Sequence, residues 1–392
     1  MMRNGMIRYA LVPGLLLGLL STYASGQTPD RRAVARNLVR AGMVKQHDKV
    51  LITGSVRDAQ LMEDIAIEAM KVGAEPLITL SSERMGRRSY DEVPAIYDTL
   101  TPALGRAIVS TFDVQIAVDV GESEGLLAGV PQVRRTARAK AGEPVTKLFY
   151  ERNVRFVNLG NGLYPTATLS RRLAVPQTRL ANVFWRAAAA SPTELRGKGE
   201  SMRSAFASGK QVSLTHPNGT NLTVEVDASR GFTSDGMLTA EKVKQGAAAA
   251  STWLPAGELI LPAKAGTARG KVVIDRILYD GKIIRGLTFT FENGRVVSMT
   301  GQGIESLKAR YDASGGGKDQ FGYIDIGLNP ETRLPVGTGR LLWTASGSVV
   351  VGLGDNRGFG GTNASDFNLS AQLGGATVKV DGRTVVDNGV LK

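Results

Sequence analysis

Residues 49–80 have the sequence KVLITGSVRDAQLMEDIAIEAMKVGAEPLITL, in which two short apolar runs flank a helical pattern. The first run, 49–54, has the length of a strand and ends at Gly54. Over 58–72, apolar residues recur at helical spacing and Gly73 follows, which predicts a helix with the apolar positions Leu61, Ile65, Ala69 and Val72. The second run, 75–80, predicts another strand. This order of elements predicts parallel strands that are joined by a crossover helix.

The same alternation continues on both sides of this stretch. Residues 31–41 carry Val34, Leu38 and Ala41 at helical spacing, which predicts a helix before the first strand. Apolar runs within 108–120 and at 154–159 predict further strands of the same sheet. We therefore expect an N-terminal α/β domain that covers residues 27–200.

The second half of the chain has a different pattern. Alternation with a period of two predicts strands over 212–214, 221–226, 271–274, 287–291, 295–299, 376–380 and 384–386. Pro217-Asn218-Gly219 and Glu292-Asn293-Gly294 are typical of hairpin turns. One helix is predicted near 304–311. These features predict a β-rich (α+β) C-terminal domain over residues 201–392.

The first 26 residues have the pattern of a signal peptide. Arg3 and Arg8 precede an apolar run at 10–20, and the small residues Ala24-Ser25-Gly26 predict a cleavage site. The run is shorter than the roughly 20 residues that span a bilayer. We expect an exported protein, periplasmic or extracellular, with no membrane span after removal of the signal. An uncleaved N-terminal anchor is the alternative.

Composition excludes several classes of site. The chain has 392 residues, no cysteine and two histidines, so thiolate sites, disulfides and sites with three imidazoles are excluded. Its formal net charge is +12, and loss of Arg3 and Arg8 would leave +10. The basic residues lie in scattered pairs and aromatic residues make up only 6%, so no nucleic-acid partner is expected.

Familiar catalytic and cofactor motifs are missing from the sequence. The run at 49–54 lacks the further glycines of a dinucleotide-binding loop, and neither a Walker lysine nor a G-x-S-x-G motif is present. His47 and His216 have no carboxylate at metal-ligand spacing, and we expect both to be structural.

A series of motifs in the second half is more specific. It begins at Trp253 with Leu254-Pro255-Ala256-Gly257-Glu258-Leu259 and continues with GKVVID at 270–275, IGLNP at 326–330 and GGTNAS at 360–365. In this order the motifs resemble the aminopeptidase T family, the thermophilic (leucyl aminopeptidase-like) metallo-aminopeptidases. The resemblance covers roughly residues 31–385. It implies an α/β domain followed by a β-rich domain, a homodimer, and the release of N-terminal residues from peptides by a site with two divalent metal ions.

The resemblance also implies which positions would hold the metal ions. The glutamate of the proline-glycine motif is present as Glu258. The family's second glutamate falls on Tyr323, its histidine falls on Val350, and its closing His-Trp-Asp falls on 368–370, where Asn368 and Ser370 stand. Only one ligand is kept. The resemblance therefore implies a divergent aminopeptidase, a hydrolase by descent, whose activity is absent or altered and which needs no cofactor.

Two alternatives remain open. Asp325 and Asp366 each lie two residues from a vacant ligand position, which returns their side chains to the same face of a strand. Glu258, Asp325 and Asp366, with Asp355 nearby, would form an oxygen-only site for Ca²⁺ or Mg²⁺, whereas an active enzyme would use Zn²⁺, Co²⁺ or Mn²⁺. The other alternative is a non-catalytic protein that binds peptides or associates with the cell envelope.

Overall fold

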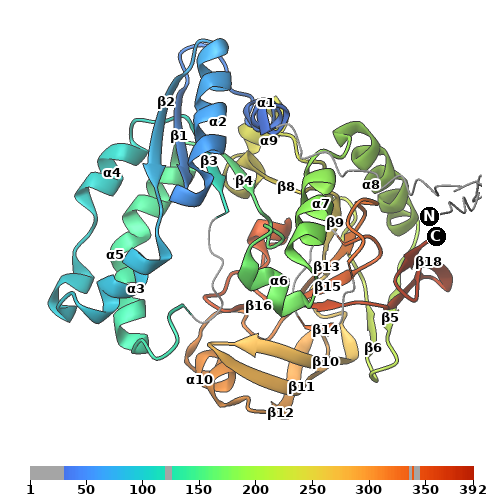
Figure 1. The fold of residues 1–392 in the computed structure, drawn as a ribbon. Helices are drawn as coiled ribbons and strands as arrows, with labels where there is room; N and C mark the ends of the chain where they lie inside the picture. Colours follow the sequence, from blue (N-terminus) through green and yellow to red (C-terminus); the bar gives the residue numbers. More distant parts are fainter. Residues whose placement is uncertain (1–30, 120–125, 335–337, 340–344) are drawn as a thin grey trace, which may run out of the picture.

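The computed structural model describes residues 31–119, 126–334, 338–339 and 345–392. These residues form one parallel sheet and two antiparallel sheets; α2 lies beside β1 and β2 of the parallel sheet, whereas α8 packs on β7 and β9 of an antiparallel one (Figure 1). The predicted signal peptide, 1–26, lies outside the described residues. Within the described part of the chain, no helix is long and apolar enough to cross a membrane.

The parallel sheet has the strand order β2-β1-β3-β4-β8. Its strands are β1 (Lys49–Gly54), β2 (Glu75–Leu80), β3 (Val114–Val118), β4 (Arg155–Leu159) and β8 (Ser251–Leu254). All four neighbouring pairs are parallel, as the pattern of residues 49–80 predicts. The inner strands β1 and β3 are largely buried, whereas the edge strand β2 leaves Leu77 and Leu80 exposed.

Two helices and the parallel strands share one hydrophobic core. Helix α1 (Arg31–Ala41) packs against α2 (Ala59–Lys71), and their apolar stripes meet Ile52 and Ile116 of the sheet. A short 3-10 helix, η1 (Val56–Asp58), precedes α2 and is capped by the Ser55 hydroxyl, which accepts the Arg57 N–H. The remaining helices of the first half are α3 (Glu83–Asp91), η2 (Ala95–Thr99), α4 (Ala103–Val109), α5 (Gln132–Glu151), α6 (Ala167–Leu173), α7 (Gln177–Ala188) and α8 (Pro192–Ala207).

One strand crosses the expected boundary near residue 200. Strand β8 follows β5, β6 and β7 in the sequence, yet it completes the parallel sheet beside β4. The chain thus returns from the second half to the first before it enters β9 (Glu258–Pro262). This return places the start of β9 at the junction of the two halves.

The second half forms an eight-stranded and a six-stranded antiparallel sheet. Their orders are β12-β11-β10-β6-β5-β17-β18-β19 and β14-β16-β15-β13-β9-β7. The strands are β5 (Val212–Thr215), β6 (Asn221–Val224), β7 (Phe232–Ser234), β10 (Arg269–Tyr279), β11 (Lys282–Glu292), β12 (Arg295–Gln302), β13 (Phe321–Gly327), β14 (Thr338–Gly339), β15 (Val349–Gly354), β16 (Asn368–Leu373), β17 (Thr377–Val380), β18 (Arg383–Asp387) and β19 (Val390–Leu391). The helices are α9 (Ala240–Gln245), η3 (Ala247–Ala250), α10 (Glu305–Ala313) and η4 (Arg357–Phe359).

A predicted turn is confirmed between β11 and β12. Asn293 and Gly294 have φ of 48° and 79°, the pair of positive values that a type I′ hairpin turn requires. Glycine is needed at the second position because its Cβ would lie 2.5 Å from the backbone nitrogen of Gly266.

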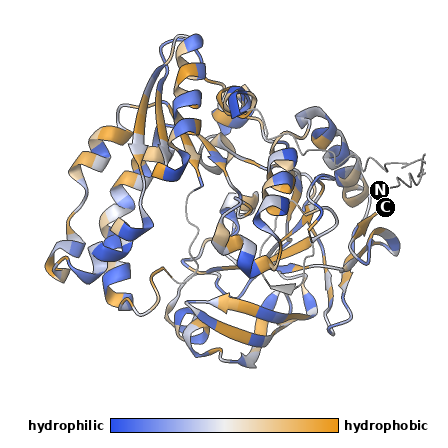
Figure 2. Ribbon diagram, in the orientation of Figure 1, coloured by the Kyte–Doolittle hydropathy of each residue, from blue (hydrophilic) through white to orange (hydrophobic). Residues whose placement is uncertain are grey.

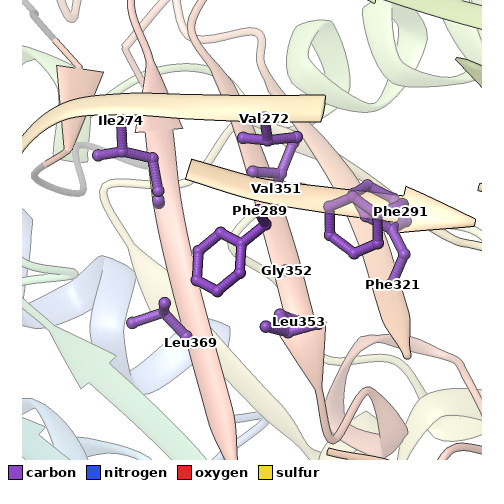
Figure 3. Close-up of a pocket in the computed structure, with 10 residues that line it drawn as sticks. Val272, Ile274, Phe289, Phe291, Phe321, Val351, Gly352, Leu353 and Leu369 are labelled. Carbon is purple, nitrogen blue, oxygen red and sulfur yellow. The ribbon is translucent and has the colours of Figure 1, made fainter. Parts of the chain in front are cut away.

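The two antiparallel sheets pack on each other through one apolar face of each. Leu259, Ile324 and Val351 of the six-stranded sheet share a core with Val272 and Phe289 of the eight-stranded one. Figure 3 shows the apolar gap that remains between them, a cavity of about 10 Å³. A single water molecule needs about this volume and polar partners as well, so we interpret the gap as a packing defect. Figure 2 shows hydrophobic residues along the strands and long hydrophilic stretches on the outer helices.

Candidate functional site

The opposite face of the six-stranded sheet carries the positions that the family pattern assigns to metal ligands. Asp325 pairs with Ile260 on one side and Val350 on the other, while Gly327 pairs with Glu258. Gly352 lies between Tyr323 and Ser370. Opposite residues of an antiparallel pair point to the same side, so these side chains share one face: Glu258, Tyr323, Asp325, Val350 and Ser370.

Glu258 lies at the start of β9, where the chain leaves the parallel sheet. Its carboxylate accepts a hydrogen bond of 2.8 Å from the Asn161 side-chain amide, and Trp253 Nε1 donates to the other oxygen. The preceding Gly257 has φ 113°, and a Cβ there would lie 2.8 Å from Cβ of Asn329. Only glycine fits this corner, which sets the direction in which Glu258 enters the strand.

Burial determines the ionisation of Glu258. The residue is 1% exposed, and desolvation raises the pKa of its carboxyl to about 7. The hydrogen bonds from Asn161 and Trp253, with the Ser234 hydroxyl on the neighbouring strand β7, act in the opposite direction by favouring the charged form. Glu258 is therefore a carboxyl group that titrates near neutral pH.

Asp325 is more isolated than Glu258. It lies in the middle of β13 with no exposed surface, and neither carboxyl oxygen has a hydrogen-bond partner among the described residues. Burial raises its pKa well above the usual range, and the negative charge of Glu258 raises it further. Burial without hydrogen-bond donors therefore disfavours the charged form of Asp325.

Tyr323 fills the space beside Asp325. Its ring lies against Gly352 so closely that a Cβ on that glycine would be 2.0 Å from the ring. The other side of the ring stacks on Phe359, with centroids 4.0 Å apart and planes at 22°. The phenol is hydrogen-bonded to the Ser370 hydroxyl, and Tyr323 has no exposed surface. The position that the sequence resemblance assigns to a second ligand is therefore a packed aromatic residue.

The other vacant positions offer no charged or imidazole ligand either. Val350 is buried and apolar. Asn368 uses its amide to donate to the Asp355 carbonyl, at 2.7 Å. The two histidines are elsewhere: His47 is exposed, and His216 contacts the Gly374 carbonyl through Nε2 at 2.9 Å. Both have the structural roles that the sequence predicts.

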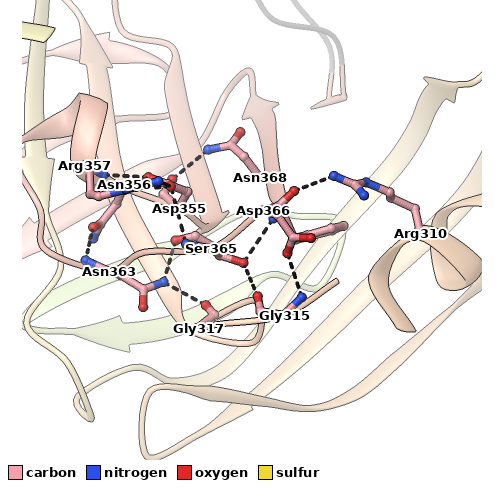
Figure 4. A network of polar contacts seen from close by, with 12 residues as sticks. Arg310, Gly315, Gly317, Asp355, Asn356, Arg357, Asn363, Ser365, Asp366 and Asn368 are labelled. Atoms are coloured by element: carbon pink, nitrogen blue, oxygen red, sulfur yellow. Dashed lines mark hydrogen bonds and ion pairs between the residues drawn. The ribbon is translucent and has the colours of Figure 1, made fainter. Parts of the chain in front are cut away.

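Asp366 and Asp355 belong to a separate loop network (Figure 4). Asp366 Oδ1 accepts a 2.6 Å hydrogen bond from the backbone of Gly315, and its carbonyl accepts one from Arg310. Asp355 forms an ion pair with Arg357. The structure therefore brings Glu258 and Asp325 together but holds Asp366 and Asp355 in the loop that follows β15.

The residues on this face do not fit a pair of divalent metal ions. Within the described ranges, no group of three or more His, Cys, Asp or Glu residues could hold a metal ion. A zinc ion takes four ligands in most protein sites, and two bridged ions need several shared carboxylates or imidazoles. Glu258 and Asp325 supply only two carboxyl groups, so the donor set is insufficient.

A second polar cluster, which the sequence interpretation missed, lies at the carboxyl ends of the parallel strands. Arg57, just after β1, forms ion pairs with Asp58 and with Asp119, the residue that follows β3. Tyr164 donates to Asp58 at 2.6 Å, and the Arg57 guanidinium lies 5.1 Å from the centre of its ring. Asn161 follows β4 at the same edge. The signal that could have found these residues is their position directly after parallel strands, where ligand sites of α/β sheets form.

Three comparisons place these features among known proteins. A family described as "NicX: 2,5-dihydroxypyridine 5,6-dioxygenase" matches residues 182–392. The structure of AmpT from Thermus thermophilus superposes with a TM-score of 0.67 at 17% identity, and covers 92% of this chain and 98% of that chain. The 2,5-dihydroxypyridine dioxygenase of Pseudomonas putida superposes with a TM-score of 0.52 at 14% identity, and covers 92% and 96%. No curated protein sequence matches significantly. The likeness to AmpT confirms the predicted fold, an α/β region followed by antiparallel sheets.

Proposed function

We propose that this chain is a member of the NicX family that has lost metal-dependent catalysis. It belongs to that family, described as 2,5-dihydroxypyridine 5,6-dioxygenase, because the family model matches residues 182–392, which is more than half of the chain. AmpT, whose fold it shares, is by name an aminopeptidase T. The proposal is that neither reaction, removal of an N-terminal residue or ring opening of a dihydroxypyridine, takes place here at the rate of an active enzyme.

One observation carries the proposal. Tyr323, to which the resemblance assigns the position of the second glutamate, is packed between Gly352 and Phe359, and its hydroxyl is bonded to Ser370. A tyrosine that has no exposed surface cannot leave this place without opening a cavity in the sheet face. The loss of the ligand is therefore accompanied by a packed replacement, as expected of a face that has become structural.

The direct test measures both activities. The purified mature chain is incubated with a panel of peptides, and separately with 2,5-dihydroxypyridine and oxygen, in the presence of Zn²⁺, Co²⁺, Mn²⁺ or Fe²⁺. We expect no metal-dependent turnover. Turnover that requires a metal ion and disappears in Glu258→Gln would contradict the proposal and support an altered but active metalloenzyme.

The remaining role is non-catalytic, and we propose binding of peptides or association with the cell envelope. The positive charge, +12 for the whole chain and +10 after loss of Arg3 and Arg8, supports an anionic partner such as an envelope surface. Calorimetric titration of the same peptide panel, and separately of lipid vesicles, into the protein distinguishes peptide binding from association with the envelope. Saturable binding of a peptide would favour the first role, whereas binding only to vesicles with anionic lipids would favour the second.

Export and dimer formation complete the proposal. The arginines and apolar run before residue 26 support export, which is tested by the mass of the mature protein in a periplasmic or culture fraction. A mass that includes residues 1–26 would contradict cleavage. The exposed apolar side chains of edge strand β2 support a homodimer.

A further inference from the structure

We infer that Glu258 holds the parallel sheet and the six-stranded sheet together, and that this is its role in place of metal binding. The inference goes beyond the proposed function, which concerns activity alone, because it assigns a positive role to the one ligand residue that the chain has kept.

Two side-chain donors of Glu258 come from the parallel sheet, whereas Ser234 lies on β7 of its own sheet. Asn161 follows β4 and Trp253 belongs to β8, which are neighbouring strands of that sheet. One carboxylate, at the first residue of β9, therefore accepts hydrogen bonds from the ends of two parallel strands. Asn161 and Glu258 are 97 residues apart in the sequence, so their hydrogen bond is a tertiary connection between the two halves.

Asn161 also fixes the segment between the sheets. Its amide donates to the carbonyl of Pro255 at 3.0 Å, and the backbone of the adjacent Gly160 donates to Leu254 at 2.7 Å. The backbone of Leu328, just after β13, donates to Gly257 at 2.7 Å. The chain from 254 to 258 is thus held from β4 on one side and from β13 on the other.

The electrostatic setting explains why the hydrogen bonds of Glu258 matter. No basic side chain of the described residues forms an ion pair with Glu258, although the residue is almost completely buried. A buried carboxylate is tolerated only where donors replace its water. Here the donors are Asn161 and Trp253, each on its own oxygen, so removal of either donor leaves the charge poorly compensated.

A double-mutant cycle tests this role in the full mature chain at pH 8. Asn161→Ala and Trp253→Phe are each made in the parent and in Glu258→Gln, and Tm is measured. In the parent, each change is expected to lower Tm by roughly 3–10 °C. In the Glu258→Gln background, each change is expected to lower Tm by less than half of its effect in the parent, because the charged acceptor is gone. Trp185→Phe is the matched control, and its effect should be equal in both backgrounds.

Metal addition forms the second arm of the test. The Tm of the parent is compared in EDTA and in excess Zn²⁺, Mn²⁺ or Ca²⁺, with Glu258→Gln alongside. We expect no shift that distinguishes the two proteins. The inference would be overturned if Asn161→Ala and Trp253→Phe lowered Tm equally in both backgrounds. It would also be overturned if a metal ion raised Tm saturably in the parent but not in Glu258→Gln.

A fluorescence measurement covers the case in which Glu258→Gln fails to fold. In a Trp185→Phe/Trp343→Phe background, Trp253 is the only tryptophan, and its emission reports the hydrogen bond directly. Asn161→Ala should shift that emission, because the carboxylate moves when it loses its other donor. An unchanged emission maximum would count against the inference. Metal-dependent activity together with a measurable interaction between Glu258 and its donors would contradict the proposed function alone. No activity together with no such interaction would contradict this inference alone.

Discussion

Glu258 and Asp325 lie diagonally across strands β9 and β13 as two buried carboxyl groups on one face of the sheet. Diagonal neighbours in an antiparallel pair are about 7–8 Å apart at Cα, near enough for the charge of one to raise the pKa of the other. The pair keeps the acidic character of a metal site, and burial disfavours the charged form of both carboxyl groups.

The stability of the protein should fall as the pH rises from 5 to 8. Glu258 has a pKa of about 7 in the folded chain against about 4.3 when unfolded, and Asp325 is raised in the same direction from about 3.9. The folded state thus binds more protons than the unfolded state in this window. The stabilisation is fully present below about pH 4 and is lost as the pH rises through the pKa values of the folded state. For Glu258 the free energy of unfolding should fall by an amount on the order of 3 kcal/mol.

Urea unfolding at pH 5, 6, 7 and 8 measures this dependence. The free energy of unfolding of Glu258→Gln should change less over the range than that of the parent, because one titrating group is removed. A parent whose stability rises steadily toward pH 8 would show that other groups outweigh this pair.

Asp325→Asn should stabilise the protein at pH 8 and have little effect at pH 5. The amide has nearly the same shape but cannot carry the charge that burial and Glu258 oppose. We expect a gain of about 1–3 kcal/mol at pH 8, in the range seen when buried charges are replaced by neutral groups. Asp366→Asn is the matched control, because its carboxylate accepts the Gly315 N–H in the exposed loop and should give no such gain. A loss of stability in Asp325→Asn at both pH values would indicate that the ionised carboxylate is required.

Gly352→Ala should destabilise the fold by roughly 2 kcal/mol or more. The new methyl group would lie 2.0 Å from the Tyr323 ring, which is held by Phe359 and cannot move freely. Gly358→Ala is the control, since no atom lies within 4 Å of its Cβ. Thermal unfolding of both variants measures the difference. Gly352→Ala should destabilise a Tyr323→Ala variant less than it destabilises the parent, because the ring that the new methyl group would meet is absent. An equal loss in both backgrounds would show that the ring and the methyl group do not compete for space.

The mature protein should be a homodimer in solution that uses the edge strand β2. Leu77 and Leu80 are 56% and 60% exposed on an unpaired edge, which favours burial against a second copy. Light scattering after size exclusion should give twice the chain mass, and Leu77→Lys/Leu80→Lys should give a monomer. Val297→Lys, an exposed position on β12, serves as the control. A monomeric parent protein would contradict the dimer, and a dimeric double variant would place the interface elsewhere.

Local patterns were enough to predict much of the fold and part of the site. The strands and helix of residues 49–80 lie within one or two residues of their expected bounds, because their apolar spacing is itself the requirement for burial. The prediction that Val350 cannot bind a metal also follows from residue type alone. The motif that contains Glu258 did not show the corner at Gly257, which appears only in the structure through its positive φ.

Contacts between distant segments could not be predicted in the same way. The sequence does not show that β8 joins the parallel sheet after three intervening strands, nor that Asn161 bonds to a glutamate 97 residues later. Asp366 has the spacing of a possible ligand, but the Gly315 backbone holds it in another network.

What the sequence determined by itself is the set of chemical groups: no thiol, two histidines, and a glutamate, a valine and a tyrosine at positions that the resemblance assigns to metal ligands. What only the tertiary structure decided is how these groups are satisfied. Glu258 accepts hydrogen bonds from Asn161 and Trp253, Asp325 is buried without a hydrogen-bond partner among the described residues, and Tyr323 packs against Gly352 and Phe359. The physical reason is that residue type limits which bonds a side chain can form, whereas burial and the neighbours supplied by distant strands determine which of them it forms.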